Sequence, residues 1–152
     1  MALGAAIFED GHGVILATSD ENTKRTIWQV KYSRLELERR FLIGTAPAGI
    51  ELGPGFSIED RYIQDTRLRL RKIDGPEGSA YKLTQKYASH GDPAVCVITN
   101  IYLDRSEYLA LKALPGKVLR KSRRRFTFEG RNFALDVYEG PLAGLRLAET
   151  EF

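Results

Sequence analysis

Alternation of charged and apolar residues, repeated in many short segments, is the feature that most constrains how this chain folds. In LELERRFLIG, residues 35–44, the charged Glu36, Glu38 and Arg40 alternate with Leu35 and Leu37. Successive side chains of a β-strand point to opposite sides, so this segment has one charged and one apolar face. Strand-like segments recur between Gly, Pro and Asp residues and predict a mostly antiparallel β protein, with strands near 34–43, 57–63, 65–73, 80–88, 94–102, 118–128, 131–138 and 144–152.

One helix interrupts the strands, which places the chain in the α+β class. Asp104 precedes RSEYLALKAL as an N-cap, Glu107 completes a capping-box pattern, and Pro115 with Gly116 ends the helix. Residues 34–152 form the main domain. Residues 1–33 are an N-terminal extension with two open interpretations: two short strands around the turn-like residues 10–13, or a mobile arm.

Composition excludes several classes of protein. No apolar run approaches the roughly 18 residues of a membrane-spanning helix, and the first residues lack the basic start of a secretory signal, so we expect a cytoplasmic protein without a membrane partner. The single Cys96 excludes an internal disulfide and a cysteine-rich zinc site. With only His12 and His90 present, imidazole-based metal binding is not expected either.

The charged residues fall into rows, each on one face of a predicted strand. The rows contain Arg67, Arg69 and Arg71; Lys82 and Lys86; Lys121, Arg123 and Arg125; Asp136; and Glu149 and Glu151. Two interpretations stay open, because solvent faces of an ordinary sheet and the lumen of a closed barrel give the same alternation. Chemically, paired carboxylates suit Mg²⁺ or Mn²⁺, while Arg and Lys rows suit phosphate oxygens.

The order of these motifs resembles a known family. LELERRFLI resembles the Glu-x-Glu-x-Lys signature that opens the CYTH, or triphosphate tunnel metalloenzyme, superfamily, with Arg40 in the place of the usual Lys. FSIEDRYI, TRLRLRK, YKLTQK, LRKSR and LDVYEGPLAGLRLAETEF follow in the family's order, so the resemblance covers residues 34–152. It implies an eight-stranded antiparallel β-barrel with few covering helices, whose charged faces line a tunnel.

The resemblance also implies roles for individual residues. Catalytic residues would be Glu36, Glu38, Glu149 and Glu151, which with Asp136 would hold Mg²⁺ or Mn²⁺. Phosphates would be bound by Arg40, Arg67, Arg69, Lys86, Lys121 and Arg123. We rank Arg71, Lys82 and Arg125 lower, because each lies near a predicted strand end, and we expect Arg39, Lys72, Arg120 and Arg124 on the outer surface. The sequence departs from the family at Ile98 and Asn100, where many members carry further glutamates.

The expected function is metal-dependent hydrolysis of a triphosphate, either inorganic tripolyphosphate or a small organic triphosphate. A non-catalytic module that binds polyphosphate or a nucleotide is the main alternative, and a class IV adenylyl cyclase is a further one. The basic and aromatic LRKSRRRF segment keeps a nucleic-acid-binding protein open, although no nucleic-acid-binding motif accompanies it, so nucleic acid is not the expected partner. The sequence does not indicate the oligomeric state, and a homodimer is one option.

Overall fold

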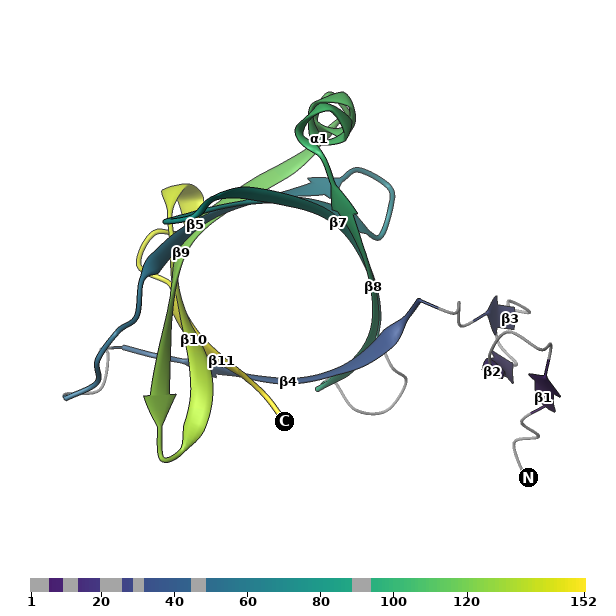
Figure 1. The fold of residues 1–152 in the computed structure, drawn as a ribbon, viewed down its shortest axis with the longest axis horizontal. Helices are drawn as coiled ribbons and strands as arrows, with labels where there is room; N and C mark the ends of the chain where they lie inside the picture. The colour runs from purple at the N-terminus through teal and green to yellow at the C-terminus, as the bar shows by residue number, and fades with distance from the viewer. Residues whose placement is uncertain (1–5, 10–13, 20–25, 29–31, 45–48, 89–93) are drawn as a thin grey trace. The chain divides into compact units, whose positions relative to one another are not determined.

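The computed structural model describes residues 6–9, 14–19, 26–28, 32–44, 49–88 and 94–152, which divide into two compact units, Met1–Arg34 and Leu35–Phe152 (Figure 1). The first unit contains an antiparallel sheet with the order β1 (Ala6–Glu9), β2 (Val14–Ser19) and β3 (Thr26–Trp28). Of the two interpretations of residues 1–33, the structure thus has the paired strands. The predicted turn at residues 10–13 lies outside the described residues.

The second unit is a closed antiparallel barrel, which confirms the predicted fold. Its ring has the order β10-β11-β4-β8-β7-β6-β5-β9 (Figure 1). The strands are β4 (Arg34–Leu42), β5 (Gly55–Ile63), β6 (Leu68–Gly75), β7 (Gly78–Ala88), β8 (Val95–Leu103), β9 (Gly116–Phe128), β10 (Arg131–Tyr138) and β11 (Arg146–Glu151). Each differs from its predicted range by a few residues at most.

The predicted start of the third barrel strand was wrong, for a local reason. Asp65 has a φ of 57° in the turn that follows β5. The hydroxyl of Thr66 donates to the carbonyl of Ile63 at 2.9 Å and accepts from the backbone N–H of Leu68 at 3.0 Å. Residues 65–67 belong to this turn, so β6 begins at Leu68 and Arg67 lies outside the strand.

Helix α1 (Arg105–Lys112) lies on the outer side of the barrel (Figure 1). Its predicted capping box is present, since the Asp104 carboxylate accepts from the Glu107 N–H at 2.8 Å and the Glu107 carboxylate accepts from the Asp104 N–H at 2.8 Å. Tyr108 is buried against Ile63 and Leu70 of the barrel wall. One hydrophobic core therefore lies between the helix and the outer face of the strands.

A second hydrophobic core also lies on the outer face of the wall. Phe126, Leu135 and Ala148 are buried, and Ile50 and Leu52 of the segment that follows β4 pack against them. Leu135 and Ala148 each precede a charged residue that points to the other side of the sheet, Asp136 and Glu149. Apolar burial thus stabilises the wall from outside, while the inner face carries most of the buried charged side chains together with Ile58 and Ile98.

The 3₁₀ turn Gly140–Leu142 connects β10 to β11. Within the described residues, no helix has the length and apolar character needed to cross a membrane.

Candidate functional site: a charged lumen

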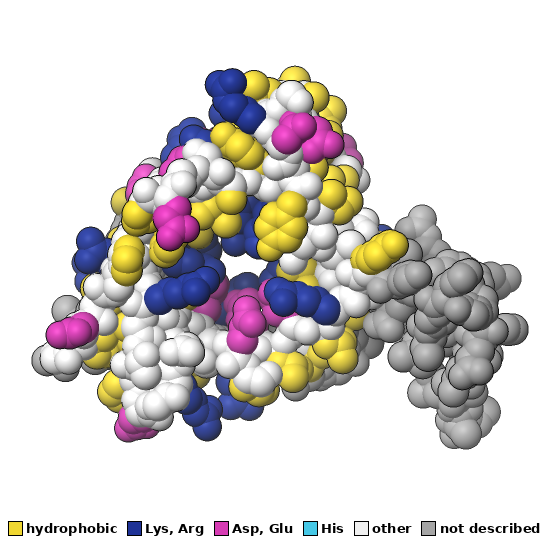
Figure 2. Space-filling model, in the orientation of Figure 1, with side chains coloured by type: hydrophobic (Ala, Val, Ile, Leu, Met, Phe, Trp, Pro, Cys, Tyr) yellow, Lys and Arg dark blue, Asp and Glu magenta, His cyan; other side chains and the backbone are white. Residues whose placement is uncertain are grey.

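Ion pairs between strands that are not neighbours show that the charged faces point into the barrel. Lys86 of β7 contacts Glu36 of β4, although β8 lies between these strands. Arg123 of β9 contacts Glu149 of β11, although β10 lies between them. Such pairs can meet only across the inner face. Figure 2 shows the resulting opening through the barrel, with cationic and acidic side chains around it.

The first cluster of the lumen is centred on Asp136, whose side chain is completely buried. Arg123 donates two hydrogen bonds of 2.6 Å to this carboxylate, and Lys121 also donates to it. Arg123 also donates a hydrogen bond to Glu149. Burial acts to raise the pKa of Asp136, but Arg123 and Lys121 outweigh it and hold this pKa below its ordinary value. For Lys121 the balance is opposite: burial lowers its pKa despite the attraction of Asp136.

Arg40 and Lys86 connect the glutamates of β4 to the rest of the lumen. Arg40 Nε donates to Glu38 at 2.6 Å and to Glu149 at 3.1 Å, so one guanidinium bridges β4 and β11. Burial acts to lower the pKa of Arg40, but the two glutamates outweigh it and raise this pKa. Lys86 contacts Glu36 and lies 3.8 Å from Glu38. The sequence motif Glu-x-Glu-x-Arg thus becomes a row of carboxylates with a cation at each end.

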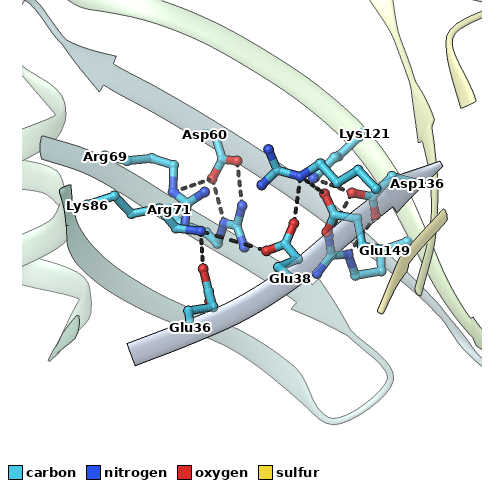
Figure 3. Close-up of polar contacts among 11 residues, drawn as sticks. Glu36, Glu38, Asp60, Arg69, Arg71, Lys86, Lys121, Asp136 and Glu149 are labelled. Carbon is cyan, nitrogen blue, oxygen red and sulfur yellow. Dashed lines mark hydrogen bonds and ion pairs between the residues drawn. The ribbon is translucent and has the colours of Figure 1, made fainter. Parts of the chain in front are cut away.

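The second cluster is built on Asp60 of β5, a residue that the sequence reasoning missed. Asp60 is 1% exposed and accepts two hydrogen bonds of 2.6 Å from Arg71, while Arg69 Nε lies 3.8 Å away (Figure 3). Burial acts to raise the pKa of Asp60, but Arg71 outweighs it, so this pKa lies below its ordinary value. Arg71 is buried, which corrects the expectation that it could be solvated at a strand end.

Lys82 lies beside the second cluster. It is the register partner of Arg71 and shares its strand face with Thr84 and Lys86, and its side chain is half-buried. Burial, together with the charges of Arg71 and Arg69, lowers the pKa of Lys82 to about 8. Lys82 was also ranked low from sequence, so both lower-ranked cations of the β6–β7 hairpin lie on the lumen face, Arg71 buried and Lys82 half-buried.

Other predicted residues lie at the edge of the lumen or outside it. Arg67 is exposed and stacks over the Tyr87 ring at 4.0 Å. Glu151 is exposed at the end of β11, directly opposite Glu38. Arg125 is exposed too. The four cations expected on the outer surface have outer surroundings: Lys72 pairs with Asp74, Arg120 with Glu59, Arg39 lies over the Phe152 ring, and Arg124 is exposed.

The two positions that depart from the family pattern have their own partners. Ile98 is 2% exposed and is the register partner of Lys86. Asn100 accepts a 2.7 Å hydrogen bond from the hydroxyl of Thr84, which is completely buried. These side chains fill this part of the β7–β8 wall with apolar packing and a neutral hydrogen bond.

The donor chemistry of the lumen fits a hard divalent cation, because glutamates of two adjacent strands face one another: Glu151 is opposite Glu38, and Glu149 is beside it. Glu38 and Glu149 are ion-paired with cations of the chain. Among the described residues, no three acidic, His or Cys side chains are arranged to hold a metal ion. A metal would therefore compete with Arg40, Lys86 and Arg123 for the same oxygens.

Comparisons with known proteins give likenesses to solved structures. No protein-family model matches the chain, and no curated protein does. Two solved structures of NE1496, one named a hypothetical protein and the other an inorganic triphosphatase, are 31% and 28% identical. The matches span 77% of this chain and 76% and 73% of those chains, with a TM-score of 0.49. PH1819 from Pyrococcus horikoshii is 21% identical over 77% of both chains, with a TM-score of 0.58, and shares the fold. The likeness to PH1819 shows a shared fold, and this closed eight-stranded barrel is the fold that the resemblance of the sequence motifs to the CYTH, or triphosphate tunnel metalloenzyme, superfamily implies.

Proposed function

We propose that the protein binds a triphosphate in the lumen of its barrel and hydrolyses the terminal phosphoanhydride bond. The observation that carries the proposal is the balance of charge in the lumen of the barrel, where cationic side chains outnumber the carboxylates that contact them. Burying so many charges is unfavourable unless they are paired. A ligand with several negative charges along a short chain would complete the pairing.

The two clusters would grip such a ligand at different places. Arg69 and Arg71 lie on the β6 wall, and Arg123 and Lys121 lie on the β9 wall. Buried carboxylates hold Arg71 and Arg123 with two hydrogen bonds each, so both guanidiniums are oriented before a ligand binds. Preorganised charges stabilise the transition state of phosphoryl transfer without reorganising during the reaction.

In the reaction, a water oxygen bonds to the terminal phosphorus, the bond to the bridging oxygen breaks, and the products are phosphate and diphosphate. A lumen glutamate would accept the proton of the water. Mg²⁺ or Mn²⁺, held by Glu36, Glu38, Asp136, Glu149 and Glu151, would supply further positive charge and lower the pKa of a bound water. The cations of the lumen orient the phosphates and exclude bulk water around them.

The test is release of phosphate from tripolyphosphate, ATP and thiamine triphosphate, each with Mg²⁺, Mn²⁺ or excess chelator. We expect release from at least one substrate with metal and none with chelator. No release from any of them, under any metal condition, would contradict hydrolysis.

Variants assign the roles. We expect Arg69→Ala to lower turnover by about 10²–10³-fold, because it removes a lumen charge that would stabilise the phosphates in the transition state, while Arg124→Ala on the exposed surface is the matched control. Glu149→Gln should lower turnover in a way that higher Mn²⁺ partly restores, and the exposed Glu77→Gln is its control. If Glu149→Gln turns over like Glu77→Gln, the proposed metal ligands are wrong even where hydrolysis is real.

One observation favours a second candidate, a binding module without catalysis. Glu36, Glu38, Asp136 and Glu149 all contact cations of the chain, which leaves them poorly placed for a metal. Such a module would bind tripolyphosphate tightly in chelator and release no phosphate in any metal. Calorimetry beside the phosphate assay separates the two functions.

A further inference from the structure

Lys82 is a cation of the lumen that has no role in the proposed function as described above. It lies in the middle of β7, opposite Arg71 on β6 and opposite Tyr102 on β8. Its side chain is half-buried, and within the described part of the chain its ammonium forms no hydrogen bond or ion pair. The other buried or half-buried lysines of the lumen, Lys86 and Lys121, each contact a carboxylate.

The groups that face Lys82 come from several strands and are mostly cationic. Arg69 and Arg71 of β6 repel its positive charge, while Asp60 of β5 and Glu36 of β4 attract it more weakly. Asp60 is already committed to Arg71 through two hydrogen bonds of 2.6 Å. Glu36 is in contact with Lys86. The carboxylates near Lys82 are therefore occupied by other cations, and none is left to neutralise it.

A second, independent observation marks the same wall. The Nε of Arg69 is buried, and among the described residues no acceptor lies within hydrogen-bond distance. Asp60 Oδ1 is 3.8 Å away, too far for a hydrogen bond. A buried donor without an acceptor is costly, so its presence beside an unpaired ammonium indicates a place for an anion.

We propose that Lys82 completes an anion site with Arg69 and Arg71 on the β6–β7 wall, and that it takes up a proton from solvent as the phosphate binds. The inference rests on the proposed function and adds to it a further phosphate-binding residue and a pH dependence of binding. No covalent step is involved: the neutral amine becomes an ammonium, and the phosphate oxygens accept its hydrogen bonds.

The direction of the pH dependence follows from the surroundings. Without ligand, burial and the two arginines lower the pKa of Lys82 to about 8, so the amine is largely neutral above that pH. A bound phosphate adds negative charge beside it and raises the pKa again. Binding is therefore coupled to proton uptake above pH 8, and affinity falls as the pH rises through that range. Below pH 7 Lys82 is already protonated and no uptake is expected.

The test is calorimetry of tripolyphosphate binding in excess chelator at pH 6.5 and pH 9, in pairs of buffers with different ionisation enthalpies. We expect Lys82→Gln to bind about tenfold or more weakly than the wild type at pH 6.5, because a charge-assisted hydrogen bond is lost. At pH 9 the wild type should take up about one proton more than Lys82→Gln, since ligand titration is common to both. At pH 6.5 this difference should vanish.

Two further variants complete the design. Lys82→Arg keeps the charge and does not titrate in this range, so it should bind more tightly than the wild type at pH 9. Lys72→Gln, on the outer face of β6 and paired with Asp74, should bind like the wild type. Equal affinity of Lys82→Gln and Lys72→Gln at pH 6.5 would overturn the anion site, and equal proton uptake at pH 9 would overturn the coupling. A wild type that binds no tripolyphosphate would refute the proposed function itself.

Discussion

Replacing Asp60 by asparagine removes the charge that holds Arg71 inside the barrel wall while nearly conserving shape. Asp60 is 1% exposed, Arg71 is 6% exposed, and two hydrogen bonds of 2.6 Å join them. Loss of one partner of a buried ion pair costs about 3–5 kcal/mol, because the other charge stays desolvated. Asparagine still accepts one hydrogen bond, so we expect the lower end, about 3 kcal/mol, which lowers the Tm by about 10 °C for a chain of this length.

The measurement is urea unfolding at pH 7, followed by circular dichroism. Asp74→Asn is the matched control. Asp74 lies two positions from Lys72 on the same strand and forms an ion pair with it at 2.8 Å, and the side chain of Asp74 is 43% exposed. An exposed pair contributes at most about 1 kcal/mol, so this variant should unfold close to the wild type.

The pH dependence gives a second readout of the same pair. Burial acts to raise the pKa of Asp60, and Arg71 lowers it by more, so the folded-state value lies below the unfolded one. The stability from this carboxylate is therefore present above its ordinary pKa of about 3.9 and is lost as the pH falls through the folded-state value. The difference between wild type and Asp60→Asn should be full at pH 7 and shrink below pH 4.

A double variant tests the desolvation argument directly. With Arg71→Met added, Asp60→Asn no longer leaves an unpaired charge, so the double variant should be less destabilised than the sum of the single variants. If Asp60→Asn instead unfolds at the same urea concentration as Asp74→Asn, the pair is solvated in the free protein. The reasoning from buried lumen charges would then be refuted.

Three further outcomes are expected from urea unfolding. Raising the pH from 7.5 to 10 should stabilise the wild type relative to Lys82→Met by about 1–3 kcal/mol. The reason is that Lys82 has a pKa of about 8 in the folded protein and a higher pKa in the unfolded chain, which therefore binds the proton more strongly. A difference in stability that does not change with pH would contradict this. Asp104→Ala removes the N-cap of α1 and should cost about 1 kcal/mol, and no loss would mean that the cap is frayed in solution. Gly116→Ala should destabilise strongly, because an added Cβ would clash with the Tyr62 carbonyl oxygen, whereas Gly44→Ala meets nothing within 4 Å and should be nearly neutral.

The fold could be predicted because its two signals agree. Strand alternation gives one charged face per strand, and the family motifs decide that this face is the inner one. Periodicity alone could not decide, since the apolar residues of β4, Leu35 and Leu37, are exposed on the outer side. The start of β6 was missed because the Thr66 hydroxyl bonds that form the preceding turn leave no distinctive pattern in TRLRLRK.

The second cluster of the lumen was harder to predict, for reasons of register. Glu59, Asp60 and Arg61 are consecutive, so both faces of β5 carry charge and alternation does not show which residue points inward. Only the pairing of Asp60 with Arg71 across β5 and β6 identifies it. Arg71 and Lys82 were judged to lie near strand ends, but β6 continues to Gly75 and β7 begins at Gly78, which places both well within their strands.

The ladder between β4 and β11 joins the first and last strands of the barrel, and this has a consequence for how the protein is made. Arg40 and Glu149 meet across 109 positions of sequence. Closing so long a loop is slow compared with forming the local hairpins β5–β6, β6–β7, β7–β8 and β9–β10. On the ribosome, a nascent chain that still lacks β11 exposes β4 and β10 as unpaired edges, which are prone to pair with other chains. The ring can close only after synthesis has passed Glu151, so this protein must complete its fold after translation of the last strand.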